Sequence, residues 1–357
     1  MTRGRARTVV VAAVGVLLAV GACTAPDPAV RASPDPSRST PSPVPPSPAP
    51  TVQPTAAASV RFSALGDIGS TEAASAVLRS IAARDDDFTL ALGDLSYGED
   101  GEEDAWCRFV TRRVGAAHPF QLVSGNHESD GPDGDIDRFV RCLPNRLPGL
   151  VGDYGRQWYV DRPTGTPLVR VVMISPSLDF GRGPWSYDEG TPHHDWLRDA
   201  VTGARRAGIP WVVVGMHKPC LSLGAYACDP GRDVVDLLLE TGVDLVLTGH
   251  EHLYQRTVPL SLGSGCATVR PGRYDRDCVA SSGGTTFVTV GTGGTRLRAV
   301  DRSDDERRYF AAMSGANADP SHGSLDVVVT ADRLTATFRA VGRGRFGDRL
   351  VLDRVDR

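Results

Sequence analysis

Short apolar runs alternate with amphipathic stretches in the part of the chain that follows residue 58. The apolar runs predict β-strands at residues 59–65, 88–92, 120–123, 168–174, 211–214 and 245–247. The stretches between them carry apolar residues at helical spacing and predict α-helices at residues 71–84, 102–114, 194–207 and 232–240. This alternation of strand and helix indicates an α/β domain.

The pattern changes after residue 252, where strands and glycine-rich turns replace the helices. Strands are predicted at residues 285–290, 325–330, 334–340 and 349–352. Strand-helix alternation followed by a β-rich part predicts two packed β-sheets flanked by helices, four layers in all. In α/β sheets the loops beyond the carboxyl ends of the strands form the binding crevice. Polar residues at strand ends are therefore the first candidates for a site.

Residues 1–22 have the composition of an export signal. Three arginines precede an apolar run at residues 9–20 that is too short to span a bilayer comfortably. The signal ends in Val20-Gly21-Ala22-Cys23, which resembles a bacterial lipobox, and cleavage before Cys23 would leave a lipid-modified N-terminus. Ordinary signal cleavage nearby is the alternative. We therefore expect an exported bacterial protein, either secreted or held at the cell surface by lipid on Cys23.

Residues 23–56 are predicted to form a linker. Proline, serine, threonine and alanine dominate this stretch, which contains eleven prolines. It has too few large apolar residues to offset the entropy cost of ordering. The prolines favour an extended, semi-rigid spacer, and a disordered tail without a spacer role is the alternative. Residues 57–357 remain, and they are long enough to form one large α/β domain.

The charge of the chain limits the kinds of partner that it can bind. The formal net charge is −4, and removal of the three arginines in the signal makes the mature chain more negative. A negative chain of this kind does not suit general nucleic-acid binding, which requires a basic surface. Nucleic acid is therefore not expected as a partner.

Apart from Cys23 the chain has six cysteines. An even number in an exported protein favours disulfides over metal thiolates. Two pairs would each enclose a short loop and leave one long-range pair: Cys220 with Cys228, Cys266 with Cys278, and Cys107 with Cys142. The sequence alone leaves this connectivity open.

Five polar clusters each follow an apolar run, and each begins with glycine. Glycine permits a sharp turn after a strand and a close approach of backbone to a ligand. The residues after it supply carboxylate, amide or imidazole groups. A single Gly-Asp pair is usually a turn or a helix cap, but five such clusters are not expected by chance. The clusters are Gly66-Asp67, Gly93-Asp94-Leu95-Ser96-Tyr97, Gly125-Asn126-His127-Glu128, Gly215-Met216-His217 and Gly249-His250-Glu251-His252.

Taken in order, these clusters resemble the motif series GD, GDxxY, GNHE, GxxH-like and GHxH of the purple acid phosphatases. This family is a branch of the metallophosphoesterase (calcineurin-like phosphoesterase) superfamily, and the resemblance covers about residues 59–352. Many members of the superfamily begin with Asp-x-His and continue with GDxxD, whereas this chain has Asp67-Ile68-Gly69 and GDLSY. The departure indicates the purple branch, in which a tyrosine replaces the missing histidine as ligand.

The resemblance implies a site with two metal ions. It assigns the ligands as follows: Asp67, Tyr97 and His252 to the first metal, Asn126, His217 and His250 to the second, and Asp94 as a bridge between them. Oxygen-rich ligation with a phenolate suits Fe(III), whereas the Asn/His/His set suits a divalent ion such as Zn, Fe or Mn. Two cations about 3.5 Å apart can clamp a phosphoryl group and activate the attacking hydroxide.

The resemblance also gives roles to two residues of the GNHE motif that are not ligands. His127 is expected near the substrate as a phosphate contact or general acid, so His127 and the bridging Asp94 are the catalytic candidates. Glu128 is expected to orient a histidine from behind. The alternatives are a structural role for His127 and a packed aromatic at Tyr97. Histidines without motif support, expected at surface or structural positions, are His118, His193, His194 and His322. For His322 the alternative is a position that faces the cleft.

Together these features predict a bimetallic hydrolase of phosphate monoesters that uses a metal-activated hydroxide on a phosphorylated small molecule. Residues 57–357 would then be the catalytic domain. A phosphodiesterase or nucleotidase with the same site is the alternative within enzymes. A metal-stabilised surface binding protein is the alternative outside enzymes, because a lipid anchor and a linker would serve it equally well.

Overall fold

The structure is a computed structural model, which describes residues 58–129, 133–143 and 145–354. The predicted export signal, the lipid attachment at Cys23 and the linker at residues 23–56 lie outside the described residues. Within the described ranges, no helix is both long enough and apolar enough to cross a membrane.

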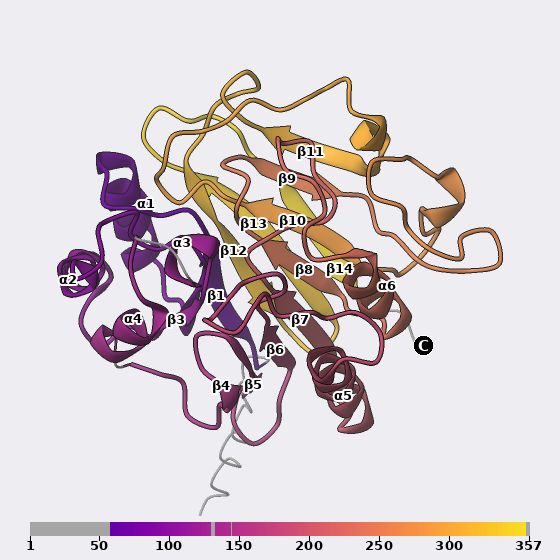
Figure 1. The fold of residues 1–357 in the computed structure, drawn as a ribbon, viewed down its shortest axis with the longest axis horizontal. Coiled ribbons are helices and arrows are strands. Elements are labelled where there is room, and N and C mark those ends of the chain that lie inside the picture. The colour runs from indigo at the N-terminus through magenta and orange to yellow at the C-terminus, as the bar shows by residue number, and fades with distance from the viewer. Residues whose placement is uncertain (1–57, 130–132, 144, 355–357) are drawn as a thin grey trace, which may run out of the picture. The chain divides into compact units, whose positions relative to one another are not determined.

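The first sheet is mixed and has six strands. They are β1 (Val60–Leu65), β2 (Phe88–Leu92), β3 (Phe120–Val123), β12 (Gly323–Val329), β13 (Arg333–Ala340) and β14 (Arg349–Asp353). Their order across the sheet is β14-β13-β12-β1-β2-β3 (Figure 1). β1, β2 and β3 are parallel, whereas β12 pairs antiparallel with β1.

The second sheet is also mixed and has eight strands. They are β4 (Val151–Asp153), β5 (Gln157–Arg162), β6 (Val169–Met173), β7 (Trp211–Gly215), β8 (Leu245–Thr248), β9 (Tyr254–Thr257), β10 (Thr286–Val290) and β11 (Phe310–Ser314). Their order is β11-β9-β10-β8-β7-β6-β5-β4. β6, β7, β8 and β10 are parallel, so their carboxyl ends lie at one edge.

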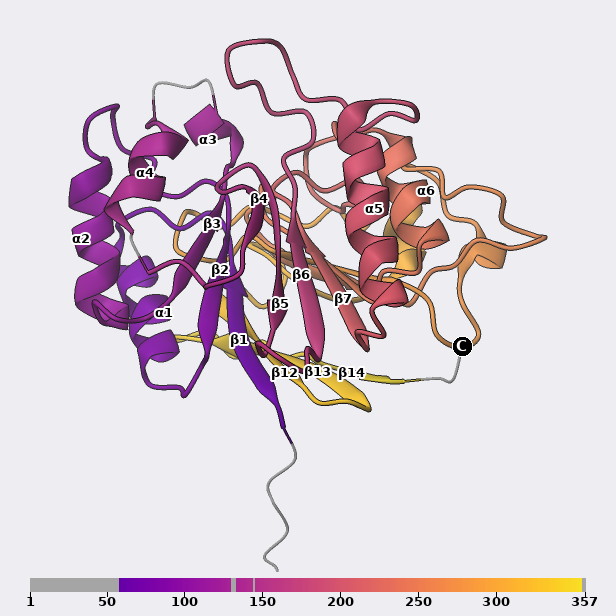
Figure 2. The ribbon, with the colours of Figure 1, turned by 90° about the horizontal axis from the view of Figure 1, so that it is seen from below.

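Helices cover the outer face of each sheet (Figure 2). On the side of the first sheet are α1 (Glu72–Ala82), α2 (Glu103–Val114) and α4 (Ile136–Cys142), and on the side of the second are α5 (Pro192–Arg206) and α6 (Arg232–Glu240). Three short helical turns, α3 (Asn126–Ser129), η1 (Arg276–Cys278) and η2 (Asp305–Tyr309), complete the described elements. The predicted four-layer α/β fold is confirmed.

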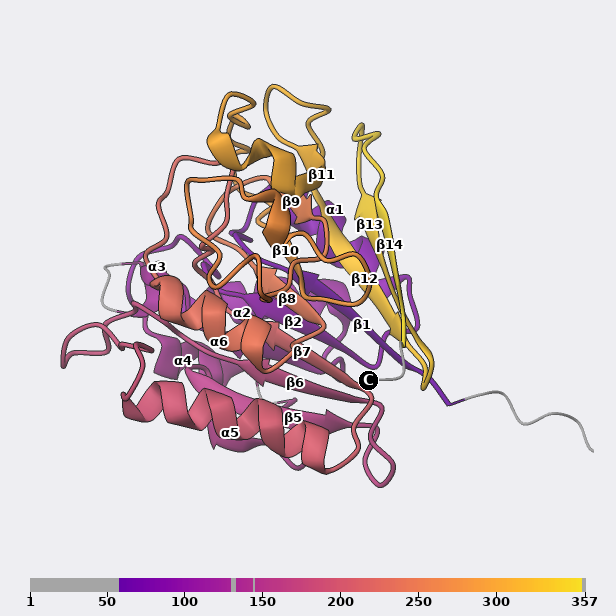
Figure 3. The same ribbon diagram turned by 90° about the vertical axis from the view of Figure 1, so that its right-hand side faces the viewer.

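The packing of the core explains why the sequences of the central strands are uninterrupted apolar runs. In β7, Val213 belongs to the same core cluster as Phe62 of the first sheet, whereas Val212 and Val214 pack in a second cluster with Leu197 of α5. Side chains alternate between the two faces of a strand, so a strand between a sheet and a helix layer must be apolar on both faces. Figure 3 shows the second sheet between α5 and the strands of the first sheet.

Every strand and helix predicted from the sequence is present, and the bounds differ by at most two residues. Shifts of two residues in helices occur at the end of α1, which is Ala82 rather than residue 84, and at the start of α5, which is Pro192 rather than residue 194. Thr191 caps this helix by accepting a hydrogen bond from the backbone N–H of His194. Proline suits the first turn because its missing N–H has no partner there anyway.

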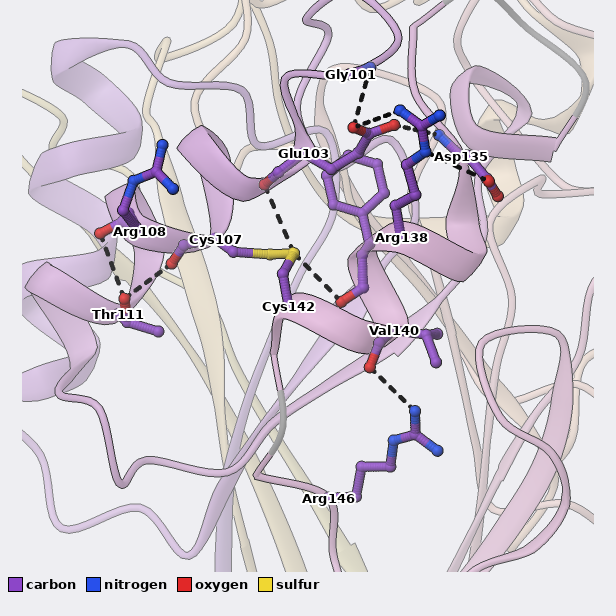
Figure 4. Close-up of a disulfide and its surroundings, with 11 residues drawn as sticks. Gly101, Glu103, Cys107, Arg108, Thr111, Asp135, Arg138, Val140, Cys142 and Arg146 are labelled. Atoms are coloured by element: carbon purple, nitrogen blue, oxygen red, sulfur yellow. Dashed lines mark hydrogen bonds and ion pairs between the residues drawn. A yellow bond between two sulfur atoms is a disulfide. The ribbon is translucent and has the colours of Figure 1, made fainter. Parts of the chain in front are cut away.

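The three proposed disulfides are confirmed: Cys107 with Cys142, Cys220 with Cys228, and Cys266 with Cys278. The first joins α2 to α4 (Figure 4). The same two helices are also linked by an ion pair, in which Arg138 Nη1 lies 3.6 Å from Glu103 Oε2. The long-range disulfide therefore fastens α4, which follows the turn α3 that carries His127, to α2.

Candidate dimetal site

The predicted metal ligands lie in loops at the carboxyl ends of strands from both sheets. Those of the first sheet are Asp67 after β1, Asp94 and Tyr97 after β2, and Asn126 after β3; those of the second are His217 after β7, and His250 and His252 after β8. The structure brings all seven together at one edge. Their donor atoms form two groups that share Asp94.

The first group surrounds the hydroxyl oxygen of Tyr97. This oxygen lies 3.0 Å from Asp67 Oδ1, 3.1 Å from Asp94 Oδ2 and 3.1 Å from His252 Nε2. His252 Nε2 lies 3.3 Å from Asp67 Oδ1. A neutral phenol has one proton to donate, so it can satisfy only one of these three neighbours.

The second group surrounds Nε2 of His217, which is fully buried. This nitrogen lies 3.1 Å from each of Asp94 Oδ1, Asn126 Oδ1 and His250 Nδ1. Asp94 therefore turns one oxygen toward each group. A carboxylate in this position has the geometry of a bridge between two cations.

The tautomers of two histidines show that both groups fit a cation. His217 Nδ1 donates to the carbonyl oxygen of Leu92 at 2.8 Å, and His252 Nδ1 donates to that of Arg296 at 3.1 Å. In each neutral ring the bare Nε2 then points at carboxylate oxygens, an arrangement that is repulsive unless a cation or proton lies between them. Asp67 Oδ2 and His250 Nε2 are also buried without a hydrogen-bond partner among the described residues.

The electrostatics of the metal-free site reflect this crowding. Burial acts against the charged form of Asp94, but the charges of His217 and His127 outweigh it and hold its pKa well below the usual range. Burial likewise opposes the charge on His217, yet Asp94 raises the pKa of this imidazole to about 9. Burial, together with Asp67 and Asp94, raises the pKa of the Tyr97 phenol far above its ordinary value. Protons therefore occupy both groups when metal is absent.

The backbone that carries these residues is strained. Four candidate ligands have a positive φ, between 49° and 67°: Asp67, Asp94, Tyr97 and His250. Residues other than glycine rarely adopt this backbone conformation. Such strain persists only where the surrounding structure imposes it, and it concentrates at functional sites.

Close backbone packing explains the glycines that begin two of the motifs. A Cβ added at Gly93 would lie 2.7 Å from Gly125 Cα and 2.7 Å from His217 Nδ1. A Cβ added at Gly125 would collide with Asp94. The turns after β2 and β3 can therefore approach each other only because both positions lack a side chain.

His127 lies beside the two groups rather than inside them. Its Nε2 is 3.6 Å from Asp94 Oδ2, and its ring centroid is 4.4 Å from that of Tyr97. Its Nδ1 contacts the carboxylate of Asp133, which keeps that nitrogen protonated and turns Nε2 toward the site. The side chain of His127 is 29% exposed, so a bound molecule could reach it.

The prediction that Glu128 orients a histidine is wrong. Its buried carboxylate accepts hydrogen bonds from the backbone N–H groups of Asp94, Leu95 and Gly125. Glu128 therefore holds the turn that presents Asp94. Burial and the nearby charge of Asp94 raise its pKa to about 8.

The histidines without motif support stay outside both groups. His118 Nε2 lies 2.8 Å from Thr89 Oγ1, and the ring of His193 stacks on Trp185. His194 is buried in α5, and His322 donates to the carbonyl oxygen of Thr295. These contacts agree with the structural roles expected for them.

Three residues near the site were not singled out from the sequence. Asp133 contacts His127, the ring of Tyr226 stacks on His250, and the guanidinium of Arg298 lies over Tyr226. No local motif marks them, because each reaches its neighbour only through the folding of a loop. The one signal available was the position of Tyr226 between Cys220 and Cys228, in the loop that follows His217.

The two packed sheets and their flanking helices define the metallophosphoesterase fold, which solved structures share. A purple acid phosphatase from yellow lupin (Lupinus luteus) seeds matches with a TM-score of 0.60 at 19% identity, covering 84% of this chain and 54% of that one. A structure of PhoD matches with a TM-score of 0.56 at 13% identity, covering 83% of this chain and 70% of that one.

The sequence places the chain in a family within this fold. The family model of the calcineurin-like phosphoesterases matches residues 60–254, and the chain belongs to this family. It is 26% identical over 318 residues to a phosphoenolpyruvate phosphatase from Allium cepa. It is 25% identical over 313 residues to the Fe(3+)-Zn(2+) purple acid phosphatase 12 of Arabidopsis thaliana.

These alignments cover most of this chain but only part of each relative. They include 84% and 82% of this chain, against 60% of the onion protein and 62% of the Arabidopsis protein. The expected resemblance to purple acid phosphatases is confirmed at the level of sequence and fold.

Proposed function

We propose that this protein is a bimetallic phosphatase that hydrolyses phosphate monoesters of small molecules. The observation that carries the proposal is the convergence of seven donor side chains in two groups that share Asp94. Within them, Nε2 of His217 lies 3.1 Å from Asp94 Oδ1 and Nε2 of His252 lies 3.3 Å from Asp67 Oδ1. Membership of the calcineurin-like phosphoesterase family and similarity to purple acid phosphatases support the same reaction.

The residues have distinct roles in this proposal. Asp67, Tyr97 and His252 would hold one cation, Asn126, His217 and His250 the other, and Asp94 both. When bound, the two cations would neutralise charge on the phosphoryl group and activate the attacking water. His127, oriented by Asp133, would donate a proton to the leaving oxygen.

The two donor groups suit different ions. A phenol, two carboxylates and one imidazole form an oxygen-rich set of the kind that favours Fe(III), whereas the amide and two imidazoles favour a divalent ion such as Zn, Fe or Mn. The relative named as an Fe(3+)-Zn(2+) enzyme supports this assignment. We therefore propose Fe(III) at the Tyr97 group and a divalent ion at the Asn126 group.

Metal analysis combined with two matched substrates tests the function. Purified protein should contain two ions per chain by mass spectrometry, and it should hydrolyse p-nitrophenyl phosphate faster than bis(p-nitrophenyl) phosphate. Faster hydrolysis of the diester would instead show a phosphodiesterase. Two bound ions with turnover of neither ester would show a metal-stabilised binding protein.

We also propose the organisation expected from the sequence: an export signal at residues 1–22, a linker from a lipid-modified Cys23 to residue 56, and a catalytic domain at residues 57–357. The lipobox-like end of the signal supports the lipid on Cys23. Cell fractionation with Cys23→Ser tests it. The variant should leave the membrane fraction or remain unprocessed. A variant that stays in the membrane at wild-type level and size would show that no lipid is attached there.

A further inference from the structure

The disulfide between Cys220 and Cys228 closes a small loop directly after the candidate ligand His217. This loop presents Tyr226, a residue that is 41% exposed. Among the described residues, the other large apolar side chains with comparable exposure are Val151 and Val351 on edge strands. Tyr226 is thus an exposed aromatic ring beside the candidate metal site.

The position of Tyr226 is set by contacts to the GHEH motif. Its backbone N–H donates to Glu251 Oε1 at 2.6 Å, and its ring stacks on His250 with centroids 4.1 Å apart and an interplanar angle of 28°. Gly224 approaches the Glu251 carboxylate so closely that no Cβ would fit. Glu251 therefore holds the loop against the site, which is a role for the residue between the two histidine ligands.

Arg298 lies on the same ring. Its guanidinium carbon is 4.7 Å from the centroid of Tyr226, a cation–π distance. Its Nη1 donates to the carbonyl oxygen of His250 at 3.3 Å, and its backbone N–H donates to that of His252 at 2.8 Å. Contacts to the ring and to both histidine residues thus fix this cation at the rim of the site.

These contacts leave part of the Arg298 guanidinium without a hydrogen bond among the described residues. Its side chain is 34% exposed, and Nη1 lies 3.8 Å from Glu251 Oε2, which is a long ion pair. Within the described ranges, no hydrogen bond from its Nε or Nη2 is found. Arginine offers five donors in a planar fork that matches carboxylate and phosphate groups. The free part of the fork is therefore available to an anion.

We propose that Arg298, seated on the ring of Tyr226, selects phosphate monoesters whose leaving group carries a second anionic group. The inference rests on the proposed phosphomonoesterase function and adds the chemistry of the leaving group. The phosphoryl group itself belongs to the two donor groups around Asp94. The cation that is fixed next to the carbonyl oxygen of His250 would contact the rest of the ester, and a cation favours a carboxylate or a second phosphate over a hydroxyl.

Three esters with one carbon skeleton test the proposal. Glycerol 3-phosphate has a neutral leaving group, 3-phosphoglycerate adds a carboxylate, and glycerol 1,3-bisphosphate adds a second phosphate. Hydrogen bonds to charged groups are strong enough for a preference of roughly tenfold or more in kcat/KM. We expect that preference for at least one charged ester, and the ester that shows it identifies the anion.

Variants connect the preference to Arg298. Arg298→Gln should abolish it, mainly through a higher KM for the charged ester, and Arg298→Lys should keep part of it because the cation remains without the fork. Tyr226→Leu should weaken it by removing the ring that holds the guanidinium. Arg333→Gln is the matched control, because Arg333 is exposed and pairs with Asp353 at a distant sheet edge.

A second measurement keeps this test separate from that of the proposed function. Inert phosphonate analogues of the same esters are titrated into metal-loaded protein by calorimetry. If the wild type hydrolyses none of the esters, the proposed function fails, and the ratio of phosphonate affinities still decides the role of Arg298. The proposal would be overturned if the wild type showed equal kcat/KM for the three esters and equal affinity for the three phosphonates. A preference that survives in Arg298→Gln would also overturn it.

Discussion

The two edges of the parallel strands differ in what they offer a ligand. A groove of about 400 Å³ lies at the amino ends of β7 and β8, lined in part by Arg205, Trp211 and Asp244. Arg205 donates there to Asp244 Oδ2 at 2.7 Å and to the carbonyl oxygen of Pro210 at 2.9 Å. At the carboxyl edge, by contrast, Asp67 Oδ2 and His250 Nε2 are buried without hydrogen bonds among the described residues. The charged groups of this groove therefore have hydrogen-bond partners, whereas a carboxylate oxygen and an imidazole nitrogen at the other edge have none among the described residues.

Backbone strain is also found at the carboxyl edge. Four residues at the carboxyl edge have a positive φ without being glycine, and such a conformation costs roughly 1–3 kcal/mol per residue. Substitutions at this edge should therefore reduce metal binding and turnover more than stability. Substitutions of ion pairs and buried polar groups elsewhere should do the reverse. Four experiments test this contrast.

Asp94→Asn should have the largest effect on function. It removes the charge that both donor groups share, so we expect loss of bound metal and a fall in turnover of roughly 10³-fold or more. Metal analysis and phosphatase assays measure both. Asparagine tolerates the positive φ of 49° at this position, so the substitution should not disturb the turn that carries it.

Asp244→Asn is the matched control at the amino edge. It removes the charged partner of Arg205 and weakens an acceptor of the Val212 N–H. This variant should unfold more easily and keep its metal content and turnover. Retention of both ions in Asp94→Asn would break the contrast between the edges.

His127→Ala should retain both ions and lose turnover. His127 contacts Asp133 and lies beside Asp94 without joining either donor group. A general acid is typically worth roughly 10²- to 10⁴-fold, and steady-state kinetics on the metal-replete variant measure the loss. Loss of metal would move His127 into the ligand set, and near-normal turnover would make it structural.

Tyr97→Phe should remove a spectroscopic signal with a smaller effect on metal content. A phenolate bound to Fe(III) gives purple acid phosphatases their colour, so the wild type should show a visible band that the variant lacks. The Asn126 group should keep its divalent ion. Tyr187→Phe is the control, because this buried phenol donates to Gln157 Oε1 at 2.5 Å, away from the donor groups. A colourless, active wild type would show that Fe(III) is absent.

Glu306→Gln should change stability and leave turnover alone. Glu306 is buried in η2 and accepts hydrogen bonds from the backbone of Ser222 and Gly272. Burial raises its pKa from 4.5 to about 7. Between these values the folded state keeps a proton that the unfolded state releases, so stability falls as pH rises, by up to roughly 3 kcal/mol.

Urea unfolding at pH 4.5 and pH 7.5 measures this effect. The wild type should lose stability relative to Glu306→Gln over that interval, and the difference should level off above pH 7. Glu240→Gln, at an exposed position in α6, should follow the wild type at both pH values. Parallel pH curves for the wild type and Glu306→Gln would show that Glu306 is already ionised at low pH in the folded protein.

The sequence predicted what is encoded locally. The candidate ligands could be found because each follows a glycine at the end of an apolar strand, and the central strands because they are apolar on both faces. β9 could not be found in this way. It reads Tyr-Gln-Arg-Thr, and its buried Gln255 accepts a hydrogen bond from the Leu223 N–H. A buried strand satisfied by side-chain hydrogen bonds has no apolar signal.

The same limit applies to the surroundings of the ligands. The role of Glu128 was predicted wrongly because its partners are backbone N–H groups, which no motif identifies. Asp133 and Arg298 touch the site through loops whose paths depend on packing. Residue types and spacing therefore located the donor atoms, whereas the contacts that orient them needed the folded chain.

The position of β12 beside β1 makes the sheet under Asp67 depend on a late part of the chain. β1 leads into Asp67 and pairs with β2 on one side and with β12 on the other (Figure 1). A growing chain that has reached His252 already contains every candidate ligand, but it lacks the strand that completes the sheet under Asp67. The edge is finished only after Val329 has been made. We therefore expect ion binding at Asp67 to await the completion of this sheet.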